Sequence, residues 1–214
     1  MAEAKTMYLN GLCFITGRKE SCLTLKESVT VVLSSGVRCI QYREKDKSRR
    51  DIYREALILR KLTNEFRAVF VINDYADIAL AVNADGVHLG QSDLPLKEAR
   101  KILGTEKMIG VSTHSIDEAI EAEAGGADYI GFGPIFHTAT KDAGKPKGVA
   151  ALRAIKKLIK IPVVAIGGIN IGNLRSVIDS GADAVAVSSG IIQGDIADNV
   201  KRFLEVLYRE NQIV

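Results

Sequence analysis

Short runs of β-branched and other apolar residues alternate with longer segments of helical periodicity along the whole chain of 214 residues. This alternation is typical of repeated β-α units, in which helices cover a parallel sheet. The apolar spacing predicts helices that include 49–66, 115–124, 148–159 and 195–209. Eight strands are predicted, at 12–17, 38–45, 69–74, 86–91, 108–113, 129–135, 162–167 and 184–189.

A weak internal repeat leads from a helix into every second strand. Its copies lie at 83–87, 126–130 and 181–185, and a looser copy at Gly36-Val37 precedes the second strand. An Asn or Gly begins each copy, which suits a left-handed helix C-cap. The three clear copies carry Asp85, Asp128 and Asp183 just before a strand. We interpret these carboxylates as structural, because a barrel carries its active site at the other end of its strands.

Eight such units in one chain predict a single (β/α)₈ TIM barrel over residues 1–214, with a short N-terminal extension at 1–10. An open doubly wound sheet is the alternative. That fold would favour a GxGxxG motif after the first strand, and none is present. Gly131-Phe132-Gly133 lacks both the third glycine and a helix start.

Composition narrows the partners that we expect. The net charge is only +3, basic and acidic residues are interleaved, and there is no Trp, so nucleic acid is not an expected partner. No apolar stretch approaches the roughly 20 residues of a membrane span, so no membrane partner is expected either. Cys13, Cys22 and Cys39 follow no metal-ligand spacing and are expected to be packing residues in a reducing cytoplasm. Composition does not predict an oligomeric state.

The run from Gln41 to Lys45 continues an apolar strand and carries unusual polarity. Side chains alternate across a strand, so Gln41, Arg43 and Lys45 share one face. If that face looks into the barrel, its charges need an anionic partner, and a phosphorylated ligand is the obvious candidate. The alternative is an exposed edge strand whose charges face water.

Other predicted strands also end in polar residues, and in a barrel these ends converge on one site. Asp74 and Asp93 follow neighbouring strands, so their carboxylates could share one Mg²⁺ ion. Alternatively, each caps or precedes a helix. His88, within a strand, is expected to be a core or lining histidine, and no nucleophilic triad is evident. The polar strand ends are Asn73 and Asp74, then Gln91, Ser92 and Asp93, then Ser112, Thr113 and His114.

The segment from Pro134 to Lys147 is long for a β-α connection, and such loops are often lids. It carries Thr138, Thr140 and Lys141, which suit phosphate oxygens, although a solvated basic loop is the alternative. The last two strands end in Gly167-Gly168 and Ser188-Ser189-Gly190. Loops after strands seven and eight of TIM barrels frequently bind phosphate. The sequence therefore predicts room for two anionic groups.

These motifs together resemble the thiamine phosphate synthase family, in order and over nearly the whole chain. The combination of Gln-x-Arg-x-Lys, Asn-Asp and Thr-x-Thr-Lys makes the resemblance specific. The motifs are QYREK at 41–45, IND at 72–74, DGVHLGQSDLP at 85–95, GVS at 110–112, GPIFHTATK at 133–141, AIGGI at 165–169 and AVSSGI at 186–191.

The resemblance implies an enzyme that joins a hydroxymethylpyrimidine diphosphate to a thiazole phosphate and releases diphosphate. It implies a dissociative reaction, catalysed by positive charge around the leaving group from Arg43, Lys45 and Lys141. It implies that Asp74 and Asp93 hold Mg²⁺. The implied pyrimidine diphosphate ligands are Gln41, Arg43, Lys45, Asn73, Ser112 and Lys141, and the implied thiazole phosphate ligands are Thr138, Thr140, Gly168, Ser188 and Ser189.

One position departs from the family pattern. His137 stands where the family usually has Pro, in the loop after the sixth strand. The related thiazole tautomerases are an alternative, but they carry a histidine at the position of Pro134 and generally lack the full Arg, Lys and paired-Asp set. A non-catalytic barrel that binds a phosphorylated metabolite is a third reading of the same site.

Overall fold

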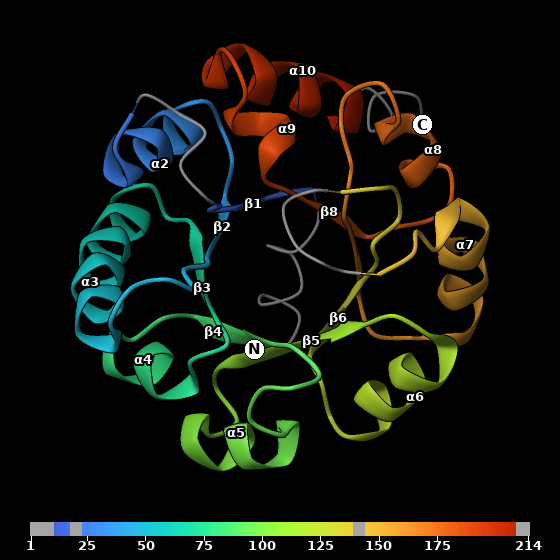
Figure 1. Ribbon diagram of the computed structural model, residues 1–214, viewed down its shortest axis with the longest axis horizontal. Helices are drawn as coiled ribbons and strands as arrows, with labels where there is room; N and C mark the ends of the chain where they lie inside the picture. Colours follow the sequence, from blue (N-terminus) through green and yellow to red (C-terminus); the bar gives the residue numbers. More distant parts are fainter. Residues whose placement is uncertain (1–10, 18–22, 139–143, 209–214) are drawn as a thin grey trace.

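The structure, a computed structural model, describes residues 11–17, 23–138 and 144–208. Eight parallel strands close into a barrel in chain order, with β1 paired to β8 (Figure 1). This confirms the predicted TIM barrel and excludes the open sheet. The predicted extension at 1–10 lies outside the described residues. The strands are β1 (Gly11–Ile15), β2 (Cys39–Tyr42), β3 (Val69–Asn73), β4 (Gly86–Leu89), β5 (Met108–Thr113), β6 (Tyr129–Phe132), β7 (Val163–Ile166) and β8 (Ala184–Val187).

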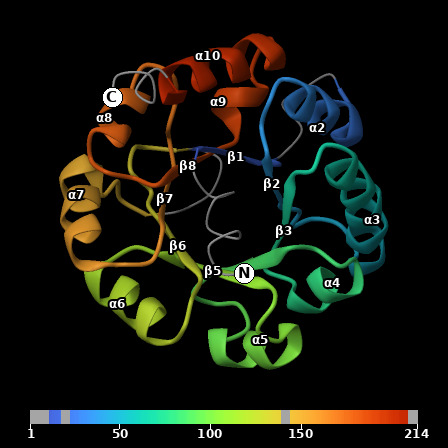
Figure 2. The ribbon, with the colours of Figure 1, turned by 180° about the vertical axis from the view of Figure 1, so that it is seen from behind.

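Helices form a ring around the strands, as seen from both ends of the barrel (Figures 1 and 2). The short helix α9 lies inward of α10, close to the strands (Figure 1). None of the helices in the described part of the chain is long and apolar enough to cross a membrane. The helices are α2 (Leu25–Ser34), α3 (Arg49–Glu65), α4 (Ala76–Ala81), α5 (Leu96–Leu103), α6 (Ile116–Ala124), α7 (Gly148–Leu158), α8 (Leu174–Ile178), α9 (Ser189–Ile192) and α10 (Ile196–Tyr208).

The barrel wall separates two apolar cores. Alternate strand residues such as Phe70 and Ile109 point outward and pack under the helices. The inward residues, among them Val71, Met108 and Tyr129, fill the barrel interior below the carboxyl ends of the strands. This two-sided burial explains why the strands are apolar on both faces. Polar inward residues gather toward the carboxyl ends, which places a site there.

The three repeated aspartates close the opposite, amino-terminal end. Asp128 precedes β6, and its Oδ2 accepts the backbone N–H of Ile109 in β5 at 2.7 Å and a hydrogen bond from Arg100 of α5 at 2.5 Å. Asp85 and Asp183 make the same pair of contacts, to Phe70 and Arg60 and to Val163 and Lys156 respectively. Each aspartate thus ties a strand to the preceding strand and helix, as the sequence interpretation expected.

The second strand is shorter than predicted, ending at Tyr42 instead of residue 45. The Thr16 hydroxyl accepts the Arg43 N–H at 2.9 Å and donates to the Arg43 carbonyl oxygen at 3.2 Å. The backbone groups of Arg43 are therefore hydrogen-bonded to a side chain and not to the backbone of a neighbouring strand. Glu44 then accepts the next two backbone N–H groups, which turns the chain away from the sheet. Arg43 and Lys45 therefore project from the loop after β2.

Candidate active site

A cavity of about 110 Å³ opens at the carboxyl ends of the strands. Its wall includes residues from the loops after β1, β2, β5, β6, β7 and β8. The structure therefore brings together residues spread from 15 to 189 in the sequence. Six predicted site residues line it: Arg43, Ser112, Thr138, Gly168, Ser188 and Ser189.

Arg43 lines this cavity, and its guanidinium is available to bind a ligand. Its backbone is fixed by the two hydrogen bonds to Thr16, which also lines the cavity. Within the described part of the chain, the Arg43 guanidinium forms no hydrogen bond or ion pair. A half-buried cation without a carboxylate partner suits an anionic ligand, because such a ligand would supply the missing counter-charge.

A second group of predicted residues lies beside the cavity. Gln41 and Asn73 are buried inward residues of β2 and β3, and the Gln41 Nε2 donates to Asn73 Oδ1 at 2.9 Å. Lys45, on the loop above, pairs with the Asp74 carboxylate. One hydrogen bond thus orients the two amides, and one ion pair ties the β2 loop to the end of β3.

The carboxyl groups of Asp74 and Asp93, predicted as a metal pair, interact with each other. Burial raises the pKa of Asp74 above its usual value, the adjacent Asp93 carboxyl raises it further, and Lys45 offsets part of the effect. Asp93 is held in place by the Gly90 N–H, which it accepts at 2.6 Å. Holding two carboxyl groups together in a partly buried place is unfavourable when both are charged. A divalent cation between them would remove this repulsion.

The described residues contain no group of three or more His, Cys, Asp or Glu side chains arranged for a metal. Mg²⁺ commonly binds one or two carboxylates and takes its other ligands from water and substrate phosphate, so a carboxylate pair is compatible with it, and a bound Mg²⁺ stays a prediction.

Helix capping does not explain these two aspartates. Helix α4 begins after Tyr75, and α5 begins after Pro95, and neither helix has a side-chain hydrogen bond at its N-cap. Asp74 also adopts a left-handed backbone conformation, with φ of +69°, which is uncommon for a residue other than glycine. Asp74 and Asp93 thus precede helices without capping them, and their role as metal ligands stays a prediction.

Glycine is required at 167 and 168, after β7, because the loop that follows β6 packs against the backbone there. Both glycines have positive φ, +94° and +66°. A Cβ on Gly167 would lie 2.6 Å from Pro134 Cα, and one on Gly168 would lie 2.3 Å from the His137 carbonyl oxygen. The chain from 134 to 137 therefore packs directly on the two glycines, which fixes the position of this side of the cavity.

The last strand contributes an unsatisfied hydroxyl. Ser188 Oγ is buried, lines the cavity and has no hydrogen-bond partner among the described residues. A buried hydroxyl without a partner is costly, and a phosphate oxygen would satisfy it. Thr138 lies on the same cavity wall. Thr140 and Lys141, predicted as ligands from the same loop, lie outside the described residues, as does Cys22.

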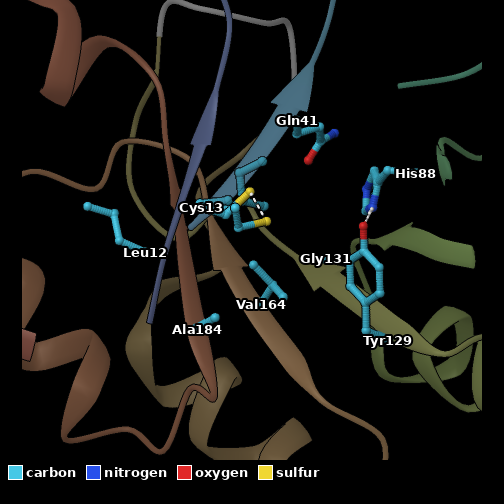
Figure 3. A pocket seen from close by; sticks show the side chains of 11 residues that line it. Leu12, Cys13, Gln41, His88, Tyr129, Gly131, Val164 and Ala184 are labelled. Carbon is cyan, nitrogen blue, oxygen red and sulfur yellow. Dashed lines mark hydrogen bonds between the residues drawn. The ribbon is translucent and has the colours of Figure 1, made fainter. Parts of the chain in front are cut away.

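A smaller cavity of about 20 Å³ lies below, inside the barrel (Figure 3). Gln41, His88 and Tyr129 line it together with the two thiols of Cys13 and Cys39. His88 is buried, as the sequence analysis expected of a lining histidine. Tyr129 and Thr16 were not predicted, because a tyrosine or threonine in an apolar strand carries no local signal that it faces inward.

The chain is similar in sequence and in fold to known proteins. The family model described as thiamine monophosphate synthase matches residues 12–191. Thiamine-phosphate synthase of Methanosarcina mazei is 49% identical over 192 residues, covering 89% of this chain and 78% of its own. That of Clostridium acetobutylicum is 46% identical over 187 residues, covering 87% and 89%. Thiamine phosphate pyrophosphorylase from Pyrococcus furiosus superposes with a TM-score of 0.87 at 37% identity, covering 98% and 99%.

Proposed function

Because the chain belongs to the thiamine monophosphate synthase family, we propose that it makes thiamine phosphate with the help of Mg²⁺. As a transferase it would move the pyrimidinylmethyl group of 4-amino-2-methyl-5-hydroxymethylpyrimidine diphosphate to the nitrogen of 4-methyl-5-(2-hydroxyethyl)thiazole phosphate, or of the carboxylated thiazole. Diphosphate is the second product. Location in the cytoplasm and the absence of nucleic-acid and membrane partners stay predictions.

The observation that carries this proposal is the pairing of two anion-receptive regions across one cavity. Arg43 follows β2 and Ser112 lies in β5, and the two strands between them, β3 and β4, lead to the loops that carry the carboxylate pair. Thr138, Gly168 and the unsatisfied Ser188 hydroxyl follow β6, β7 and β8, on the other part of the barrel. A reaction that joins two phosphorylated molecules needs both regions at once, whereas a single-substrate enzyme needs only one.

We assign the pyrimidine diphosphate to the first side. Its diphosphate would accept hydrogen bonds from Arg43, Lys45, Asn73 and Ser112, with Gln41 beneath the ring. Mg²⁺ held by Asp74 and Asp93 would add positive charge beside the leaving diphosphate. Positive groups fixed in place before reaction stabilise the charge that develops as the bond to diphosphate breaks.

We assign the thiazole phosphate to the second side, with Ser188, Ser189, Thr138 and the Gly168 backbone as its ligands. Phosphate bound there holds the thiazole nitrogen toward the pyrimidine methylene carbon, which replaces a chance encounter by a fixed geometry. No side chain has to act as a strong base, because the thiazole nitrogen attacks with its own lone pair. Thr140 and Lys141 stay predictions.

The tautomerase alternative finds less support. Its histidine position is Pro134 here, and His137 nearby is exposed and does not line the cavity. His114 does line the cavity, but its Nδ1 is bonded to the Gly133 carbonyl oxygen at 2.6 Å. A tautomerase also has no use for paired carboxylates beside a lysine.

The test is incubation of the purified protein with both substrates, with and without Mg²⁺, and quantification of thiamine phosphate and diphosphate. We expect equal amounts of the two products, dependent on Mg²⁺. Isomerisation of the carboxylated thiazole phosphate alone would support the tautomerase. Binding of either substrate without turnover would support a metabolite sensor.

A further inference from the structure

Three polar side chains connect the barrel interior to the cavity floor. Tyr129 of β6 bonds to His88 of β4, with 3.1 Å between the phenol oxygen and Nδ1. His88 Nε2 lies 2.9 Å from Ser112 Oγ of β5, and Ser112 lines the cavity above. Figure 3 shows the phenol and imidazole meeting end to end. Neither Tyr129 nor His88 has a part in the reaction as described so far.

Glycines on neighbouring strands make room for both rings. A Cβ on Gly110 would lie 2.1 Å from Cζ of Tyr129, and a Cβ on Gly131 would lie 2.9 Å from Cε1 of His88. Neither glycine has a positive φ, so backbone conformation does not explain them. The two rings therefore occupy space that only glycine leaves, and their positions are fixed by the strands beneath them.

The direction of the hydrogen bonds follows from the phenol. Burial raises the pKa of Tyr129 well above its usual value, so the hydroxyl keeps its proton. Within the described chain the Tyr129 hydroxyl has His88 Nδ1 as its acceptor, and a buried hydroxyl hydrogen without an acceptor is costly. With Nδ1 accepting, the imidazole proton lies on Nε2 and is donated to Ser112 Oγ.

This order decides what Ser112 can offer a ligand. A serine oxygen that accepts from Nε2–H has its own hydrogen directed elsewhere. In the opposite order, Ser112 would donate its hydrogen to His88 and present only lone pairs to the cavity. Lone pairs repel phosphate oxygens, whereas an O–H donor binds them.

We propose that Tyr129 and His88 are positioning residues that fix the histidine tautomer and thereby turn the Ser112 hydroxyl hydrogen toward the diphosphate substrate. This rests on the proposed function, since it assigns the diphosphate as the group that Ser112 meets. Tyr129 acts from the barrel interior, through His88, without contact with substrate.

The test is a double-mutant cycle between Tyr129→Phe and Ser112→Ala, with steady-state kinetics for both substrates. Tyr129→Phe keeps the ring over Gly110 and removes only the hydroxyl. We expect kcat/KM for the pyrimidine diphosphate to fall by up to roughly tenfold, because tenfold is typical of losing one hydrogen bond to a charged group and part of the enzyme keeps the productive tautomer. The KM for the thiazole phosphate should not change.

In the Ser112→Ala background the same tyrosine change should have no further effect, because the hydroxyl that it orients is gone. A loss of the same size that persists in that background would overturn the proposal. Tyr42→Phe is the matched control. Tyr42 is an equally buried barrel tyrosine whose hydroxyl donates to Glu55 at 2.6 Å, on the outer side of the wall. It should leave kcat/KM unchanged.

A second measurement does not depend on activity. Nitrogen NMR shifts of His88 in the substrate-free protein should show the proton on Nε2, and in Tyr129→Phe they should show a mixture of tautomers. A proton on Nδ1 in the unmodified protein would refute the inference even if the enzyme is active. If the protein forms no thiamine phosphate, the proposed function fails, while the tautomer result still stands.

Discussion

Replacing Asp128 by alanine should weaken the fold and leave the chemistry intact. The carboxylate accepts the Ile109 N–H at 2.7 Å and pairs with Arg100 at the amino-terminal end of the barrel. That end lies opposite the cavity. Asp128→Asn keeps an oxygen that can accept the backbone N–H but removes the charge, so the two substitutions separate the contributions.

The expected losses follow from the two contacts. Ile109 is fully buried, so its N–H without an acceptor costs about 1–3 kcal/mol. The Arg100 pair is partly exposed, with side-chain exposures of 26% and 36%, and adds at most about 1 kcal/mol. Asp128→Ala should therefore lower the free energy of unfolding by about 3 kcal/mol, and Asp128→Asn by about 1 kcal/mol. For a chain of this size the corresponding Tm shifts are roughly 6–12 °C and 2–4 °C.

Urea unfolding followed by circular dichroism measures both losses, and kcat/KM is measured well below the lower Tm. Asp179→Ala is the control, because it removes an exposed pair with Arg175 and should cost less than about 1 kcal/mol. Equal destabilisation by Asp128→Ala and Asp128→Asn would refute the role of the backbone hydrogen bond. A fall in kcat/KM of the folded variant would refute the structural interpretation.

Three further changes test the site. Arg43→Ala should lower kcat by about 10²–10³, the usual effect of losing one charge-stabilising donor, at unchanged Tm; a normal rate would remove Arg43 from catalysis. Mg²⁺ at ten times its Kd should stabilise the unmodified protein by about 1.4 kcal/mol in thermal unfolding, and this gain should disappear in Asp93→Asn. An equal gain in both would place the metal elsewhere. Gly131→Ala should displace the His88 ring and destabilise the fold by about 1–3 kcal/mol, which chemical unfolding measures. An unchanged free energy of unfolding would mean that the ring can move aside without strain.

The fold was predictable because its main signal is local. All eight strands were located, since each is a short apolar run buried on both faces and bounded by turns. The end of β2 was wrong by three residues because it depends on Thr16, far away in sequence. The short helices 174–178 and 189–192 were not assigned, because four or five residues are too few to show helical periodicity.

The candidate site was predictable where chemistry and strand ends coincide. Arg43, Asp74 and Ser188 stand at such ends, and closing the barrel brings them to one face. Thr16 and Tyr129 could not be found in this way, because their importance lies in which partner they meet across the barrel. That information depends on the register between strands and on the space left by glycines, neither of which has a local sequence signature.

The pairing of β1 with β8 also determines when the protein can become active during its synthesis. Gly11 pairs with Ala184. The first strand can therefore pair with its second neighbour only after almost the whole chain has been synthesised. Until then both edges of the growing sheet carry unpaired backbone groups and are prone to aggregate. Thr16 and Ser188, which follow these two paired strands, line the same cavity only after this closure. A nascent chain therefore has no partial activity, and truncation before the last strand should leave an inactive, aggregation-prone fragment.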